Sequence, residues 1–210
     1  AVELVAVRRF RDEWERNASK RLRAHDPKVV AEYEEHGRIV GTPGARVGVS
    51  ACDAWFADRA HGLDSVIVVD TAALAAELSG RCQELLRVGD LLGERVRDAC
   101  ADGNPLHVGD VVQTRSNTRA LTTSDGTRVL NRDVWRITGR ADNGQIRAVS
   151  LTRRATVLLT DEYVAADVVL AYATTIAGAQ GRTTDTGHVV VTPRTALTIC
   201  MLCGRLTNTR

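Results

Sequence analysis

The sequence predicts a mixed α/β domain that is interrupted by a small β-barrel. Residues 65–70 (SVIVVD) form an apolar, β-branched run typical of a strand buried on both faces, and Thr71 follows as a helix cap. A second strand followed at once by a helix start is expected from residue 168. From Gly109 onward, short runs of alternating polarity separated by turn signals are typical of a barrel. The expected parts are an α/β domain in two segments and a barrel between them: residues 1–105, 161–210 and 106–160.

Two helices are expected near the start of the chain. Trp14, Ala18 and Leu22 are four residues apart and would share one face of the first helix. Asp26 followed by Pro27 predicts the start of the second, because Asp caps a helix and the N–H that Pro lacks is unused at the first position.

Two further helices are expected around the first buried strand. Ser50 with Asp53 forms a capping-box pattern, which predicts that a third helix opens there. The helix capped by Thr71 should run to about Val88, just before a glycine. Residues 91–105 are then expected to hold a helix fragment and a turn.

The inserted segment reads as a series of short strands. Asp-Gly at 125–126 and Asp-Asn-Gly at 142–144 are hairpin turn signals. The strands expected around them are VVQTR, RALTT, TRVLN, VWRITGR, IRAVSL and ATVLL.

The last segment carries the pattern with the most chemical content. Residues 168–173 predict a strand, and Thr174 and Thr175 predict the helix start after it. The free N–H groups of a helix start are a natural phosphate site, and the following Gln180-Gly181 places an amide beside a backbone that a ligand can approach. A further strand and a last helix are expected at residues 188–192 and 192–204.

Charge is distributed unevenly along the chain. The net charge is +2, but residues 106–160 carry nine basic and four acidic side chains. A local basic segment can be a phosphate-contacting surface, and it can equally be the solvated face of a sheet.

The cysteines and the hydropathy pattern favour a cytoplasmic protein without a membrane segment. The five cysteines are irregularly spaced and form no disulfide framework. Cys200 and Cys203 make a lone CxxC, which supplies only two zinc ligands, so we interpret them as core thiols. No run approaches the ~20 apolar residues of a membrane span.

The segment YATTIAGAQG (172–181) resembles motif V of superfamily 1 helicases of the RecD-like branch, whose usual form is close to YA-T-T-x-H-[KR]-[SA]-Q-G. Ala177 and Gly178 stand where that motif has its His and its basic residue. Further matches occur in the family's order: VRRF with WE (7–15), Y..HGRI (33–39), the strand and turn at 65–71, GD.V with Asn (109–117), Asn-Arg-Asp for Asn-Gly-Asp (131–133), and AL with MLCGR (196–205).

The layout is similar to the second motor domain of these helicases, a RecA-like domain called 2A with an SH3-like insertion called 2B. The greatest likeness is to the helicase region of TraI/TrwC-type conjugative relaxases. The resemblance implies an ATP-dependent DNA helicase. Because the family's Asn-Gly-Asp turn favours a left-handed residue, Arg132 in the glycine position should strain or reshape that loop.

The resemblance also implies that this half cannot hydrolyse ATP alone. No GxxxxGK[ST] loop occurs in the sequence, so ATP and Mg²⁺ would bind only together with a missing first motor domain, on the same or another chain. Arg9 and Arg205 are then the candidate arginines for the transferring phosphate, although Cys203 stands where that arginine is expected in motif VI. Gly181 and Thr183 would lie beside the nucleotide.

For DNA, the resemblance implies contacts to the backbone of a single strand from five residues: Arg115, Asn117, Thr174, Thr175 and Gln180. Capping and turn chemistry would explain the threonines equally well. Trp135 could stack on a base or lie in the core. Two functions stay open: the motor half of a helicase, and a degenerate, non-catalytic module that binds DNA or protein. A third, an unrelated α/β enzyme, has no motif behind it.

Overall fold

The computed structural model describes residue 10, residues 12–180 and residues 182–192. The protein is mixed α/β with several sheets, and its chain divides into two compact units. The larger unit comprises residues 48–179 and 183–190. The described part of the smaller unit comprises residues 10, 12–47, 180, 182, 191 and 192.

The smaller unit contains the two predicted N-terminal helices, α1 (Glu13–Arg23) and α2 (Val29–Glu35). α2 begins two residues later than the Asp-Pro pattern predicts: Lys28 is its N-cap, and Asp26 accepts from the Lys28 N–H at 3.0 Å in the turn before it. The ring of Trp14 in α1 stacks on His36 at the end of α2, with centroids 3.7 Å apart. These contacts join the two helices into a hairpin.

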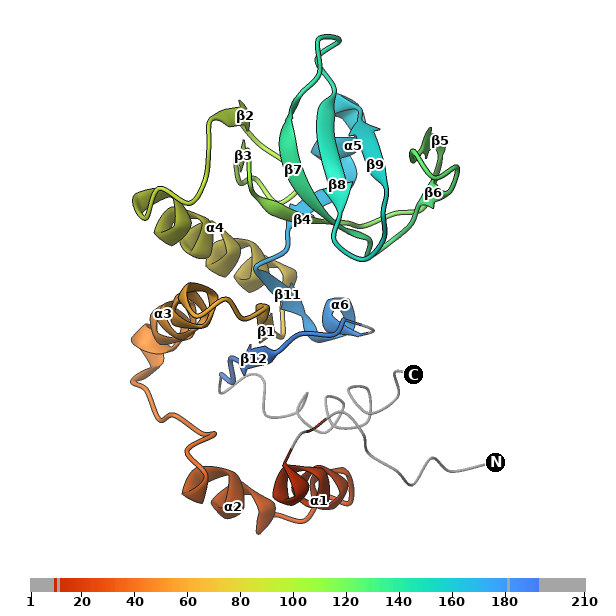
Figure 1. Ribbon diagram of the computed structural model, residues 1–210. Helices are drawn as coiled ribbons and strands as arrows, with labels where there is room; N and C mark the ends of the chain where they lie inside the picture. Colours follow the sequence, from red (N-terminus) through yellow and green to blue (C-terminus); the bar gives the residue numbers. More distant parts are fainter. Residues whose placement is uncertain (1–9, 11, 181, 193–210) are drawn as a thin grey trace, which may run out of the picture. The chain divides into compact units, whose positions relative to one another are not determined.

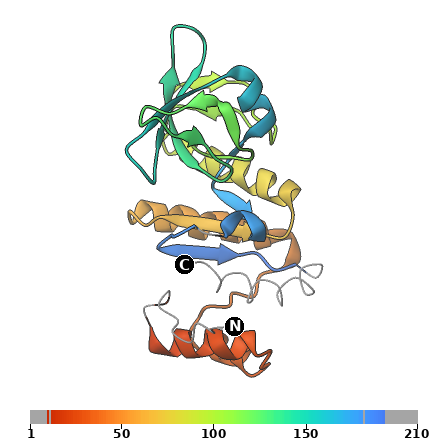
Figure 2. The ribbon, with the colours of Figure 1, turned by 90° about the vertical axis from the view of Figure 1, so that its right-hand side faces the viewer.

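The larger unit is built around β1 (Ser65–Val69), all of whose residues are buried. It pairs in parallel with β11 (Ala173–Thr175) on one side and β12 (Thr186–Val189) on the other. α4 (Ala72–Val88) follows β1, and the Thr71 hydroxyl accepts from the Leu74 N–H at 3.2 Å, which confirms the predicted cap. Figures 1 and 2 show α4 lying between this sheet and the antiparallel strands.

The predicted third helix is present but starts earlier than predicted, and the described residues 91–105 hold no helix. α3 runs from Val47 to Ala60, so Ser50 lies inside it and does not cap it. The 3-10 turn η1 (Gly44–Arg46) continues directly into α3, which removes the need for a capping box. In place of a helix fragment at 91–105 the structure has β2 (Arg95–Arg97), which pairs with β3 (Leu106–His107) across a bulge.

The predicted strands of the insertion are all present, but they form an open sheet. The order of the five antiparallel strands is β10-β4-β7-β8-β9: Val168–Leu170, Val111–Thr114, Val134–Arg140, Ile146–Ser150 and Thr156–Leu159. In this part of the chain the edge strands β10 and β9 do not pair, so the sheet is not a closed barrel. The strands β5 (Thr118–Thr122) and β6 (Arg128–Val129) pair separately as a short ribbon.

Both predicted hairpin turns are confirmed by glycines in the left-handed region. Gly126 joins β5 to β6 with φ 78°, and Gly144 joins β7 to β8 with φ 85°. The inward-facing residues of β7 and β8 alternate with exposed ones, and Trp135 is fully buried among them. Trp135 is therefore a core residue, and base stacking on it is excluded.

The strand predicted at 168–173 divides between the two sheets. β10 pairs with β4 in the antiparallel sheet, whereas β11 pairs with β1 in the parallel sheet. Ala171 and Tyr172 form the bend between them. The strand predicted at 188–192 lies at Thr186–Val189 instead, and the last predicted helix, with Cys200 and Cys203, lies outside the described residues.

Candidate nucleic-acid interface

A cleft of about 440 Å³ lies where α4 starts after the carboxyl end of β1, and its lining includes all of β11, two residues of β10, and Ala101 and Asp102. Its walls include four alanines from the first two turns of α4 (Ala72, Ala73, Ala75 and Ala76). Ligands of open α/β sheets bind at this edge, outside the carboxyl ends of parallel strands. Arg115, Thr174 and Thr175, which are three of the five predicted DNA contacts, also line this cleft. The structure thus brings together residues about sixty positions apart.

The start of α4 gives the cleft a positive end. The first turn of a 17-residue helix presents backbone N–H groups that have no acceptor within the helix, and the helix dipole adds a partial positive charge. Alanine side chains at Ala72 and Ala73 let a ligand approach that backbone closely. This end of the cleft suits an anion.

The two threonines play different structural roles. The Thr175 hydroxyl accepts a hydrogen bond from the Gly178 N–H at 3.2 Å, so the capping role is observed for this residue at the start of α6 (Ile176–Ala179). Thr174 is 7% exposed, and its hydroxyl makes no hydrogen bond to any residue that the structure describes. The Thr174 hydroxyl is therefore not used by the described residues, and the Thr175 hydroxyl, which only accepts here, keeps its own proton to donate to a ligand.

Arg115 is exposed at the end of β4, and its backbone is held from two sides. Its N–H donates to the Asp167 carbonyl at 2.7 Å, and the next carbonyl, of Ser116, accepts from the Tyr163 hydroxyl at 2.7 Å. Within the described residues the Arg115 guanidinium makes no ion pair or hydrogen bond. Burial raises the pKa of Tyr163, so the phenol stays a donor.

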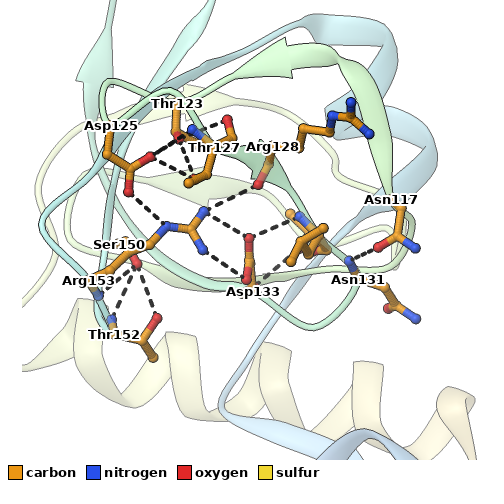
Figure 3. A network of polar contacts seen from close by, with 12 residues as sticks. Asn117, Thr123, Asp125, Thr127, Arg128, Asn131, Asp133, Ser150, Thr152 and Arg153 are labelled. Atoms are coloured by element: carbon orange, nitrogen blue, oxygen red, sulfur yellow. Dashed lines mark hydrogen bonds and ion pairs between the residues drawn. The ribbon is translucent and has the colours of Figure 1, made fainter.

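The side chain of Asn117 connects two turns. Its side-chain oxygen accepts from the Asn131 N–H at 2.7 Å, which ties the turn after β4 to the turn before β7 (Figure 3). Arg132 in that second turn has φ 72°, which confirms the prediction of a left-handed residue at the position where the family has glycine. Because the side-chain oxygen is used in this bond, Asn117 would contact a ligand through its amide NH₂ group, as a donor.

Of the remaining predicted residues, the structure describes Gln180 and Thr183. Gln180 follows α6 in a turn and belongs to the smaller compact unit. Thr183 is exposed in the loop before β12 and does not line the cleft. Arg9, Gly181 and Arg205 lie outside the described residues, so their predicted roles toward ATP stay predictions.

No model of a known protein family matches this sequence, and no curated protein matches it either. The described residues contain no cluster of three or more His, Cys, Asp or Glu side chains arranged to hold a metal ion. Among the same residues, no helix has the length and apolar character needed to cross a membrane. Cys52, Cys82 and Cys100 are free and buried. The helicase resemblance therefore depends on the sequence motifs alone.

A buried polar network next to the cleft was not predicted. Asp110 is fully buried at the start of β4 and accepts hydrogen bonds from the Tyr172 hydroxyl at 2.6 Å and from the Gln83 amide at 2.7 Å. The His107 N–H donates to the same carboxyl group at 2.6 Å. Burial raises the pKa of Asp110 despite these donors. The network fixes the bend that leads into β11 and its threonines.

A second cluster joins α3 to the parallel sheet. One oxygen of Asp58, Oδ2, accepts from Ser65 at 3.0 Å, from Thr186 at 2.5 Å and from His188 Nε2 at 2.8 Å. Burial alone would raise the pKa of Asp58, but the three hydrogen bonds together lower it. The structure brings Ser, His and Asp side chains together here, but Ser65 and His188 both bond to the carboxylate and not to each other, so this is a structural clamp and not a nucleophilic triad.

Proposed function

We propose that this chain is the second motor half of a RecD-like, ATP-dependent DNA helicase, as in the helicase region of a conjugative relaxase. Its larger unit would be the RecA-like 2A domain with an SH3-like 2B insertion. A parallel sheet with β1 at its centre, interrupted by an antiparallel sheet between α4 and β11, supports this interpretation. The order of the motif matches along the sequence supports it as well.

One observation carries the proposal: the cleft gathers Thr174, Thr175 and Arg115 at the start of α4. Hydroxyl, guanidinium and helix N–H groups are the donors that hold backbone phosphates without reading base edges. The alanine wall offers no side-chain donor or acceptor to a base. We therefore propose that the cleft binds the sugar-phosphate backbone of a single DNA strand, independently of its sequence.

ATP and Mg²⁺ would enter only with a first motor domain that supplies the phosphate loop. In that assembly this chain would contribute arginines to the transferring phosphate, and Arg9 and Arg205 remain the candidates. Alone, the chain is proposed to bind DNA and not to hydrolyse ATP.

The second candidate function is a non-catalytic DNA-binding module, and one packing detail favours it. A Cβ atom added at Gly178 would overlap the Thr174 hydroxyl oxygen. The basic residue that the family has at this position would therefore displace Thr174 from its present rotamer. The present packing of Thr174 against Gly178 is therefore incompatible with that basic residue. A chain that no longer acts as a motor would tolerate this loss.

The test is fluorescence anisotropy of a labelled oligo(dT) titrated with the chain at several salt concentrations. The proposal predicts binding whose logarithm falls linearly with log[salt], with a slope of roughly −0.7 for each phosphate contact on a single strand. Thr174→Val, which removes the hydroxyl at nearly constant volume, should weaken binding, and Arg115→Ala should also make the slope shallower by about 1. Arg147→Ala is the matched control, because this exposed arginine pairs with Gly139 far along β7. If the wild-type chain shows no binding at low salt, the proposed function is wrong.

A further inference from the structure

The turn before β7 holds an arginine in a conformation that arginine rarely adopts. Arg132 has φ 72°, and it is exposed. A left-handed non-glycine residue persists only where the surroundings determine it, and such positions cluster at functional sites. We infer that Arg132, together with Arg115, forms a second phosphate contact on the inserted sheet, beyond the cleft. This inference rests on the proposed binding of single-stranded DNA.

The backbone of this turn is fixed on every side. The Arg132 N–H donates to the Thr114 carbonyl at 2.7 Å, and the Thr114 N–H donates to the Asp133 carbonyl at 3.1 Å. The Asn131 N–H donates to the Asn117 side chain at 2.7 Å (Figure 3). These bonds hold the backbone around Arg132, so the turn geometry does not depend on the guanidinium itself.

The two carboxylates around the turn already share another arginine as their ion-pair partner. Arg153 lies 3.2 Å from Asp133 and 3.5 Å from Asp125 (Figure 3). Its guanidinium also lies 5.2 Å from the centre of the buried Trp135 ring. The Leu130 N–H donates to the Asp133 carboxylate as well, at 3.0 Å. Arg132 is therefore left without a carboxylate partner, and in the described part of the chain its guanidinium makes no hydrogen bond or ion pair.

Arg132 and Arg115 start from adjacent points of the backbone. The carbonyl that accepts from the Arg132 N–H belongs to Thr114, the residue immediately before Arg115. Both side chains are exposed, and neither is paired within the described residues. Two unpaired cationic side chains that start from adjacent backbone positions favour an anion between them, because each gains an opposite charge. A backbone phosphate fits this charge arrangement, and guanidinium groups bind phosphate with two parallel N–H donors.

Arg115 links this contact to the cleft, because it lines the cleft and stands next to the turn. A strand bound in the cleft would therefore continue over Arg115 to Arg132. The family has glycine at the position of Arg132, so this contact would be an addition specific to this chain.

The decisive variant is Arg132→Gly, because it should weaken DNA binding without lowering the stability of the fold. Glycine adopts φ 72° without strain, so the melting temperature should stay level or rise by about 2–4 °C. Affinity for oligo(dT) should fall roughly three- to tenfold at low salt, and the log–log salt slope should become shallower by about 1. Arg147→Ala, which removes one exposed arginine on β8 opposite Gly139, is the control and should change the affinity less than twofold.

Each other outcome overturns the inference in a different way. A lower melting temperature for Arg132→Gly would show that the side chain supports the fold. Equal affinity of Arg132→Gly and wild type would exclude the contact while leaving the proposed function intact. Equal losses in Arg132→Gly and Arg147→Ala would show general charge attraction. Absence of binding by the wild-type chain would reject the proposed function, and this inference with it.

Discussion

Replacing Tyr172 by Phe tests the buried network that fixes the approach to the cleft. The Tyr172 hydroxyl donates to Asp110 at 2.6 Å and accepts from the Val111 N–H at 3.3 Å. Losing a hydrogen bond to a buried carboxyl group costs about 1.5–3 kcal/mol, and leaving the N–H without an acceptor adds about 1 kcal/mol. We expect Tyr172→Phe to lower the free energy of unfolding by about 2.5–4 kcal/mol and the melting temperature by roughly 5–15 °C.

Urea unfolding followed by circular dichroism measures this loss, and Tyr163→Phe is its matched control. The Tyr163 hydroxyl is also in the larger unit, but it donates to the neutral carbonyl of Ser116, so its loss should cost only about 0.5–1.5 kcal/mol. The reasoning is refuted if Tyr172→Phe is no more destabilising than Tyr163→Phe. An unchanged m-value is needed for the comparison, because a changed m-value indicates altered denatured or intermediate states.

Three further predictions address the threonines, the Asp58 clamp and ATP. Gly178→Ala should force Thr174 out of its rotamer and weaken oligo(dT) binding severalfold, as measured by anisotropy; unchanged binding would exclude Thr174 as a contact. Asp58→Asn should lower the free energy of unfolding at pH 7, as measured by urea unfolding. The difference in this free energy between the variant and wild type should become smaller as the pH falls below about 4. The chain alone should hydrolyse no ATP in a phosphate-release assay, with or without single-stranded DNA.

The sign of the pH prediction follows from the direction of the shift. The pKa of Asp58 is lower in the folded state than its ordinary value, so the folded state favours the ionised form. Its stabilisation is present above the ordinary carboxyl pKa and is lost as the pH falls through the lowered one. A difference in unfolding free energy between wild type and Asp58→Asn that stays constant from pH 7 to pH 3 would contradict this account. Measurable ATP hydrolysis by the purified chain would contradict the third prediction.

The elements that could be predicted from the sequence are those whose cause is local. The β-branched run of β1, the Thr71 cap and the glycines at 126 and 144 each act within a few residues. The left-handed backbone at Arg132 was also predictable, because the turn demands it whichever residue stands there. Ser50 failed as a helix start because a preceding 3-10 turn already leads into α3.

What could not be predicted depends on pairing between distant strands. The run at 168–173 is equally apolar throughout, so nothing local shows that β10 and β11 join different sheets. The Asp110 network connects residues 27 and 62 positions apart, and only the fold brings them together. The hydrophobic pattern showed that Trp135 could be core, but only its complete burial excludes stacking on a base.

The candidate site was predicted in part, through the family resemblance. Thr174, Thr175 and Arg115 do meet in one cleft, whereas Thr183 does not line it. The contribution of the α4 start was missed, although the strand followed by a capped helix at Thr71 was the signal that could have revealed it.

The measurement that most directly tests the central claim is an NMR titration of the ¹⁵N-labelled chain with oligo(dT) at low salt. The account predicts the largest amide shifts at Ala72, Ala73 and Thr175, where the start of α4 meets the end of β11. The same shifts should be absent with an uncharged peptide nucleic acid of equal sequence, because the backbone phosphates are the proposed contact. Shifts confined to the exposed face of β7 and β8, around Arg147, would contradict the account and place DNA on the sheet instead of in the cleft.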